Sequence, residues 1–188
     1  MMRLLSLLAG TLLLAYPLAV YRGLTHWGSS ALLGILLVTF ALRLLPGLSP
    51  VREWLLLGRL LACVGLVLTA LSAFFSAQHW LLYYPIAVSL ALLGLFGWSL
   101  TQPMSLVERL ARLQDPDLPP AGVRYTRTVT KVWCGFFVLN GSLAAATVWY
   151  GDLAIWSLYN GLVSYLLMGL LMGGEYLVRL RVKRSFAS

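Results

Sequence analysis

The stretch that decides the fold is residues 60–107, LLACVGLVLTALSAFFSAQHWLLYYPIAVSLALLGLFGWSLTQPMSLV. It contains no aspartate, glutamate, lysine or arginine. A helix crosses the hydrocarbon core of a bilayer with about 20 apolar residues, so this stretch is too long for a single span. The polar pair Gln78-His79 marks the turn inside it. The sequence therefore predicts two membrane spans here, near 54–77 and 80–101.

The composition of the whole chain supports a membrane protein. Of its 188 residues, 60% are hydrophobic and 11% charged, whereas a typical soluble domain has about 25% charged residues. A soluble fold of this size could not remove so much apolar surface from water. We therefore expect residues 1–188 to form one membrane domain, an all-α, polytopic transmembrane bundle of about six helices.

The other four spans are predicted near 4–21, 27–45, 132–151 and 153–174, with a cytoplasmic loop at 102–131 and a cytoplasmic tail at 175–188. A cleaved signal peptide is the alternative for the first segment. Residues 15–19, AYPLA, make a poor small-x-small cleavage site, which favours a retained helix.

The basic residues predict the orientation of the chain. With a cytoplasmic N-terminus, thirteen of the fourteen lysines and arginines fall on the cytoplasmic side, and only Arg22 falls outside. This is the bias that cytoplasmic loops of membrane proteins show, and it predicts that both termini are cytoplasmic. It also explains the net charge of +8 without a nucleic-acid partner.

The loop 102–131 contains a predicted surface helix. Ser105 and Glu108 fit a capping box, and Leu106 and Leu110 share one face of the turn that follows. We expect this helix to lie along the membrane with its basic face toward anionic headgroups, and to end in an extended turn at residues 115–120, DPDLPP. In the tail, Glu175 precedes Arg179 by four residues and predicts an ion pair.

Polar side chains at membrane depth are the first candidates for a functional site, because they are costly to bury in lipid. Asn140 lies near the middle of the fifth predicted span, and we expect it to hydrogen-bond another helix. A second polar patch lies on the sixth span, at Tyr159, Asn160, Ser164 and Tyr165. The alternative for both is a ligand or transport pathway.

Small residues on the last two spans predict close helix packing. Gly169 and Gly173 form a GxxxG pair, and Gly141 and Ala145 have the same spacing. Such pairs predict either that the last two spans approach each other closely or that they form the face of a homo-oligomer.

No catalytic motif is visible in the sequence. Cys63 and Cys134 lie in apolar runs without ligands at metal-binding spacing, and no phosphate loop or HExxH string occurs. His26 and His79 are both predicted at the outer face, each beside a tryptophan, where interfacial residues are usually only solvated. We expect neither an enzyme nor a bound cofactor or metal.

Two strings resemble a known family. Residues 125–141, YTRTVTKVWCGFFVLNG, and 156–161, WSLYNG, are similar to small bacterial inner-membrane proteins encoded among genes for aryl polyene and type II fatty-acid-like synthesis. The WxxFFxxN core at 133–140 also resembles intracellular septation protein A. The resemblance implies a bacterial inner-membrane setting, with acyl carrier proteins or pathway enzymes as partners besides membrane lipids.

Three functions follow as hypotheses. The first is a non-enzymatic accessory protein that docks acidic partners on cytoplasmic cations, namely Arg109, Arg112, Arg124, Arg127 and Lys131. The second is a small transporter or flippase for a lipid product, and the third is an envelope factor of the septation type. A membrane-embedded acyltransferase is a more distant fourth.

Overall fold

The computed structural model describes residues 17, 20–21, 33–34, 36–38, 40–41, 52–74 and 78–187. These residues form helices and no strand, which confirms the all-α prediction for this part of the chain. Most residues of the predicted spans near 4–21 and 27–45 lie outside it. The elements are α4 (Arg52–Phe74), a 3₁₀ turn η2 (Gln78–Tyr83), α5 (Tyr84–Ser99), α6 (Leu106–Arg112), α7 (Pro120–Tyr150), α8 (Leu153–Leu158), a π-helical turn η3 (Tyr159–Val163) and α9 (Ser164–Ala187).

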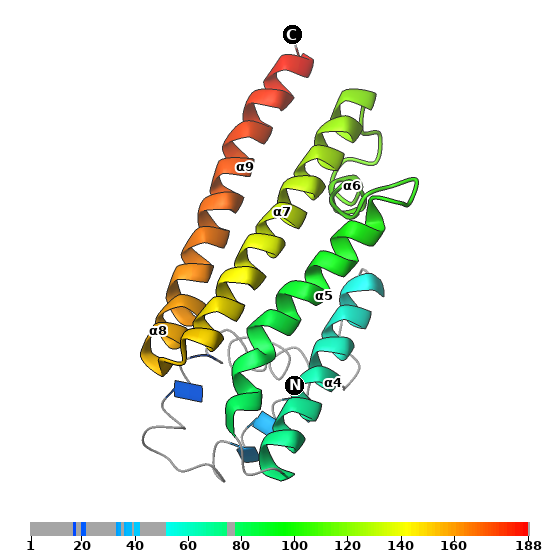
Figure 1. Ribbon diagram of the computed structural model, residues 1–188. Coiled ribbons are helices and arrows are strands. Elements are labelled where there is room, and N and C mark those ends of the chain that lie inside the picture. Colours follow the sequence, from blue (N-terminus) through cyan, green and yellow to red (C-terminus); the bar gives the residue numbers. More distant parts are fainter. Residues whose placement is uncertain are drawn as a thin grey trace.

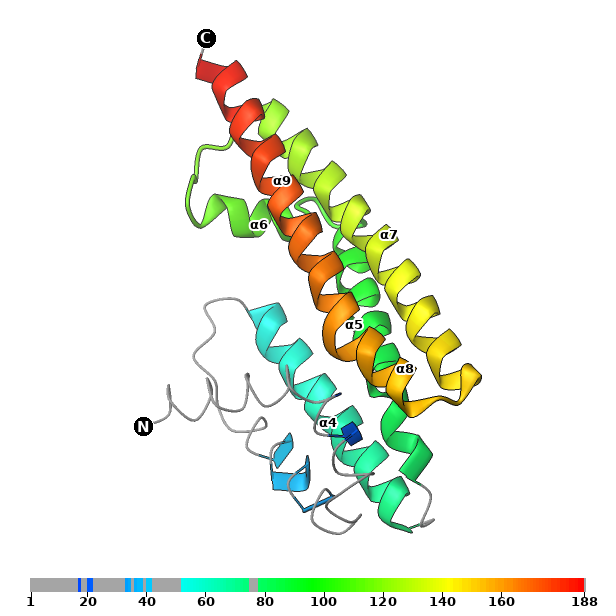
Figure 2. The ribbon, with the colours of Figure 1, turned by 90° about the vertical axis from the view of Figure 1, so that its left-hand side faces the viewer.

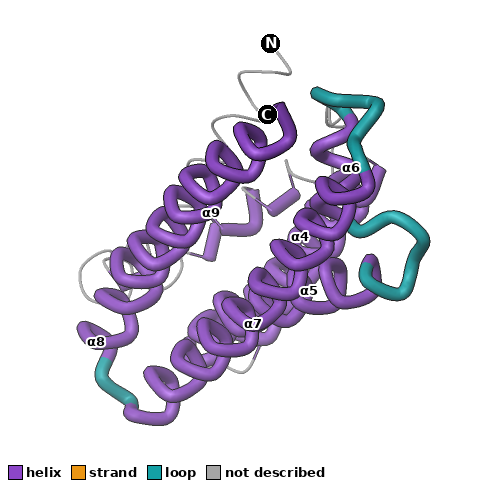
Figure 3. Tube along the Cα trace, turned by 90° about the horizontal axis from the view of Figure 1, so that it is seen from above, coloured by secondary structure: helices purple, strands orange, loops and turns teal. Residues whose placement is uncertain are grey.

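Three continuous helical stretches are long and apolar enough to cross a membrane: Trp80–Ser99, Pro120–Tyr150 and Leu153–Val182. They run as long rods, with α5 and α7 side by side and α4 against α5 (Figure 1). In the view from above, α9 lies to one side of the group formed by α4, α5 and α7 (Figure 3). The apolar part of α4, Gly58–Phe74, is shorter than the other three.

The central contact of the fold is between α5 and α7. Phe96 of α5 packs edge-on against Phe137 of α7, with ring centroids 5.2 Å apart, and both rings are buried. Leu106 of α6 completes this cluster, so the short helix is held against the two long ones. The packing follows helical spacing, because Phe137, Gly141 and Ala144 present one buried face of α7.

A second hydrophobic cluster holds the helices together at the other end of the bundle. Trp156 of α8 is 1% exposed and its indole N–H donates to the Leu82 carbonyl of η2 at 3.1 Å. Leu81 and Tyr84 pack into the same cluster, as do Val20, Leu36 and Phe40 from the N-terminal part of the chain. Burial of an aromatic ring with its N–H satisfied explains why α8 is anchored here.

Two helices extend beyond the predicted spans. The helix that carries the fifth predicted span begins earlier than predicted, at Pro120 and not near residue 132, so the last part of segment 102–131 is helical. Proline is favoured in the first helical turn, where no backbone donor is needed, and so residues 115–120 end one helix and start the next. Likewise α9 continues through the predicted tail to Ala187. A 31-residue helix is about 46 Å long, so α7 is longer than a hydrocarbon core of about 30 Å.

The predicted surface helix is present as α6. Ser105 is its N-cap and its hydroxyl accepts from the Glu108 backbone N–H at 3.4 Å, which confirms the first half of the capping box. The Glu108 carboxylate accepts instead from Arg112 at 3.0 Å. The Leu106 backbone N–H also donates to Ser99 at 3.0 Å, which ties the start of α6 to the end of α5.

The turn between α7 and α8 is built from two residues suited to it. Gly151 has φ of 81°, a left-handed conformation that ends α7 and favours glycine. Asp152 then caps α8, accepting from the backbone N–H groups of Ala154 at 2.7 Å and Ile155 at 3.0 Å.

We expect Asp152→Ala to destabilise the protein by about 0.5–2 kcal/mol, because two helix N–H groups lose their acceptor. The free energy of unfolding in mixed detergent micelles measures this loss. Asp152→Asn, which can still cap, should recover most of it. Equal losses for the two variants would contradict a capping role.

Candidate functional site

A chain of hydrogen bonds crosses the bundle at the position of Asn140. The Tyr159 hydroxyl donates to Asn140 Oδ1 at 3.0 Å, and Asn140 Nδ2 donates to Ser89 Oγ at 3.2 Å. The Ser89 hydroxyl in turn donates to the Pro85 carbonyl at 3.0 Å. We call these three linked side chains the polar chain. It joins the π-helical turn to α7 and α7 to α5, as expected for a polar group at membrane depth.

The polar chain confirms the predicted interhelical hydrogen bond of Asn140. Asn140 and Ser89 are both buried, and both ends of the Asn140 amide have partners. A donor and acceptor matched in a low-dielectric interior stabilise the packing and fix its register. This arrangement favours the packing role of Asn140 over a pathway role.

Asn160 lies on the π-helical turn beside Tyr159. Its side-chain N–H groups donate to the Trp156 carbonyl at 2.9 Å and to Thr147 of α7 at 3.3 Å. Asn160 Oδ1 is buried and has no hydrogen-bond partner among the described residues. Ser164 is buried one turn later, and its backbone N–H donates to the Tyr159 carbonyl, the five-residue spacing of a π turn. Two successive side chains, Tyr159 and Asn160, therefore both reach α7 from one turn.

The predicted small-residue pairs behave differently from each other. A Cβ at Gly141 would lie 3.1 Å from the Ser89 Cβ, so Gly141 allows close approach of α7 to α5, not to the last span. Nothing in the described part of the chain lies within 4 Å of a Cβ built at Gly169 or Gly173. These two glycines do not bring the last two spans together in the described structure, and their role in a homo-oligomer stays a prediction.

The predicted docking cations lie at one end of the bundle, which we call the basic end. It comprises α6, the first turns of α7 and the last turns of α9, at the top of Figure 1 and again in Figure 2. Two of its arginines bind within the fold. Arg112 pairs with the buried Glu108 and donates to the Pro116 carbonyl at 2.8 Å. Arg127 donates to the Leu100 carbonyl at 2.6 Å, at the C-terminal end of α5.

The remaining cations of the basic end are turned outward. Arg124 and Lys131 are exposed and lie seven residues apart on α7, on the same face as the exposed Thr128. Arg181 of α9 is exposed as well, and Arg109 of α6 is partly exposed. Arg112 and Arg127 therefore bond within the fold, although Arg127 is itself exposed, whereas Arg124 and Lys131 are exposed without such a bond to a described residue.

The bond between Tyr125 of α7 and Glu175 of α9 was not foreseen from the sequence, although close approach of the last two spans was one of the two predicted alternatives. The predicted pair of Glu175 and Arg179 is confirmed, with Arg179 Nε donating at 2.9 Å. The Tyr125 hydroxyl also donates to the Glu175 carboxylate at 3.2 Å and lies 3.1 Å from the Glu175 carbonyl. Sequence spacing reveals the pair within α9, but no local pattern relates Tyr125 to a residue fifty positions away.

The described residues contain no group of three or more histidine, cysteine, aspartate or glutamate side chains that could hold a metal ion. Cys63 is exposed and Cys134 partly exposed. His26 and the side chain of His79 lie outside what the structure describes. Comparisons of the chain with protein-family models, curated proteins and solved structures find no match.

Proposed function

We propose that this chain is a non-enzymatic accessory protein of the bacterial inner membrane that docks an acidic partner on its basic end. In the proposed topology six helices cross the membrane, both termini are cytoplasmic and the basic end lies in the cytoplasm. The partner class is an acyl carrier protein, or an enzyme that carries one, from a lipid-like biosynthetic pathway. That class comes from the resemblance of residues 125–141 and 156–161 to proteins encoded beside such pathways.

One observation carries the proposal: exposed cations from two helices gather at the same end. Arg124 and Lys131 of α7 and Arg181 of α9 are all exposed there. Four acidic residues lie at this end, in α6, α9 and the turn that joins α6 to α7, and seven described cations outnumber them: Glu108, Asp115, Asp117 and Glu175 against Arg109, Arg112, Arg124, Arg127, Lys131, Arg179 and Arg181. The residual field of the surface is positive, which favours association with an acidic protein.

The Tyr125 contact supports the same surface. By joining Glu175 to α7, it holds the end of α9 beside the start of α7. Cations on the two helices are then presented at fixed positions. A surface fixed before binding loses less side-chain and segmental entropy on association than a freely moving tail does.

The test is binding of the cognate acyl carrier protein to the full chain in nanodiscs of zwitterionic lipid. The triple variant Arg124→Gln, Lys131→Gln, Arg181→Gln removes exposed charge without touching Arg112 or Arg127. We expect it to weaken binding at least about tenfold at 0.1 M salt, and wild-type binding to fall as salt rises.

Arg59→Gln is the matched control, because Arg59 is also an exposed arginine but lies on α4, away from α7 and α9. It should leave the affinity unchanged. Unchanged affinity in the triple variant, or an equal loss in Arg59→Gln, would overturn the proposal. If the triple variant instead loses affinity only when the nanodiscs contain anionic lipid, the cations bind headgroups and the docking function is wrong.

A further inference from the structure

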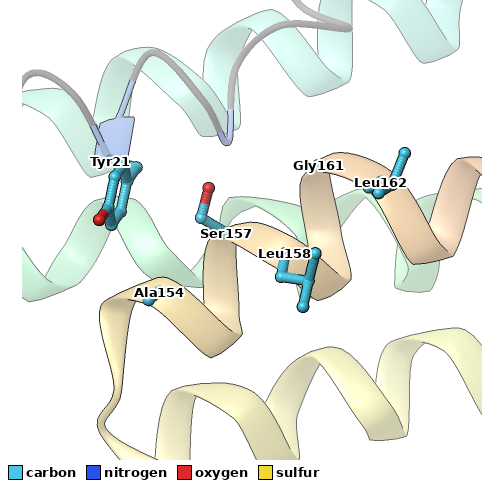
Figure 4. A pocket seen from close by; sticks show the side chains of 6 residues that line it. All are labelled: Tyr21, Ala154, Ser157, Leu158, Gly161 and Leu162. Carbon is cyan, nitrogen blue, oxygen red and sulfur yellow. The ribbon is translucent and has the colours of Figure 1, made fainter.

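A pocket of about 390 Å³ lies at the end of the bundle opposite the basic end. It is lined by residues of α8 and the π-helical turn together with one residue from the N-terminal part of the chain: Tyr21, Ala154, Ser157, Leu158, Gly161 and Leu162. Figure 4 shows Tyr21 facing the helical segment that carries the other lining residues, with the Ser157 side chain on the side toward Tyr21. The polar chain and Asn160 contact α7 and do not line this pocket.

Gly161 lies beside Pro17 at the edge of this pocket. A Cβ at Gly161 would lie 3.5 Å from the Pro17 Cβ, an ordinary van der Waals contact. Pro17 therefore approaches the π-helical turn at Gly161, and Tyr21 lines the pocket nearby. A π turn carries an extra residue and is often found at functional positions of a helix.

The polarity of the lining residues indicates what kind of molecule can fill the pocket. Among the described residues that line it, the polar side-chain groups are two hydroxyls, those of Tyr21 and Ser157. Water filling this volume would need two to four polar partners for each molecule, which the lining does not supply. An empty space would forfeit dispersion contacts along the whole wall. The pocket lies on the stretch Leu153–Val182, which is apolar enough to cross a membrane. In a membrane, the acyl chains of lipids would surround this stretch and could enter the pocket.

The polarity of the pocket also has a direction. Ala154 and Ser157 lie nearer to the start of α8, which follows the exposed aromatic residues Trp149 and Tyr150, and Ser157 is the polar one of the two. Aromatic side chains of this kind mark the level of the lipid headgroups. Leu158, Gly161 and Leu162 lie farther along the stretch, toward the interior of the membrane. An amphiphile whose polar group lies near Ser157 and whose chain runs toward Leu162 matches this gradient.

We propose that this pocket binds one acyl chain of a membrane glycerolipid, with the Ser157 hydroxyl donating to the ester carbonyl. The site is distinct from the basic end and does not depend on the docking function. Its volume is at the lower end of the range for ligand pockets, about 300–1,000 Å³, which suits a single chain better than a bulky ring system.

The experiment uses the full chain in vesicles of phosphatidylethanolamine and phosphatidylglycerol that contain a trace of phosphatidylethanolamine with a photoreactive diazirine on one acyl chain. After illumination, mass spectrometry maps the labelled residues. We expect labelling at residues 154–162 to exceed that of the exposed α9 residues Leu166 and Leu170, which do not line this pocket.

Ser157→Leu fills the pocket and removes its donor, and should reduce labelling at 154–162 about three- to tenfold, equivalent to about 0.6–1.4 kcal/mol. Leu170→Phe, an equally apolar change on an exposed part of α9, should leave it unchanged. Ser157→Ala keeps the space but loses the hydroxyl, and should give an intermediate reduction even if the leucine variant fails to fold. Uniform labelling of 154–170 in the wild-type protein, or labelling unaffected by Ser157→Ala, would overturn the proposal.

Discussion

Gly141→Leu is expected to destabilise the protein by about 1–3 kcal/mol, because a side chain there must force α5 and α7 apart. The added Cβ alone would lie 3.1 Å from the Ser89 Cβ, closer than ordinary contact, and the rest of the leucine has no space between the helices. The Phe96–Phe137 contact lies on the same helix pair and would be strained too. The free energy of unfolding, measured by steric trapping in bicelles, gives the size of the effect.

Gly135→Leu is the matched control on the same helix. Gly135 is exposed, and no described atom lies within 4 Å of a Cβ built there. The same substitution should change the unfolding free energy by no more than about 0.5 kcal/mol. Similar losses at both glycines would show that leucine affects α7 itself and not its packing on α5.

Asn140→Leu, made alone in the wild-type protein, is expected to lower the free energy of unfolding by about 1–3 kcal/mol. Two interhelical hydrogen bonds are lost, each worth about 0.6–1.7 kcal/mol in a membrane, and the Tyr159 hydroxyl loses its acceptor. Leucine is similar in size to asparagine, so the loss reports hydrogen bonding more than volume. Ser142→Ala, at an exposed position two residues away, should have little effect.

A double-mutant cycle separates the Tyr159 link from the rest. Asn140→Ala combined with Tyr159→Phe should show a coupling free energy of about 0.6–1.7 kcal/mol. A coupling near zero would mean that the hydrogen bond at 3.0 Å does not stabilise the bundle. If Asn140→Leu left stability unchanged, the amide would be retained for something other than packing, and the pathway role would become the better explanation.

Several features of the site follow from short-range patterns in the sequence. Ser105 caps α6 because a hydroxyl three residues before an acidic residue satisfies an N-terminal helix donor. Glu175 and Arg179 meet because residues four apart share a helix face. Asn140 was expected to hydrogen-bond another helix because lipid chains have no hydrogen-bonding groups. The sequence did not identify Ser89 or Tyr159 as its partners.

Helix boundaries were harder to predict, for a physical reason. Charged residues show where the chain leaves the hydrocarbon core, but a helix does not have to end there. Arg124, Arg127 and Lys131 are compatible with helix, so α7 continues through them from Pro120. For the same reason α9 continues past Arg179 to Ala187.

The sequence by itself determined that this chain is helical and apolar enough to cross a membrane, since length, hydropathy and charge spacing are properties of consecutive residues. It also located the Ser105 cap of α6 and the ion pair within α9. Only the tertiary structure decided which arginines bind carbonyls and carboxylates and which stay exposed, and that Gly141 faces Ser89 while Gly169 and Gly173 face no described neighbour. Those facts depend on the rotation and approach of helices distant in the chain, which are set by packing between side chains and not by any local pattern.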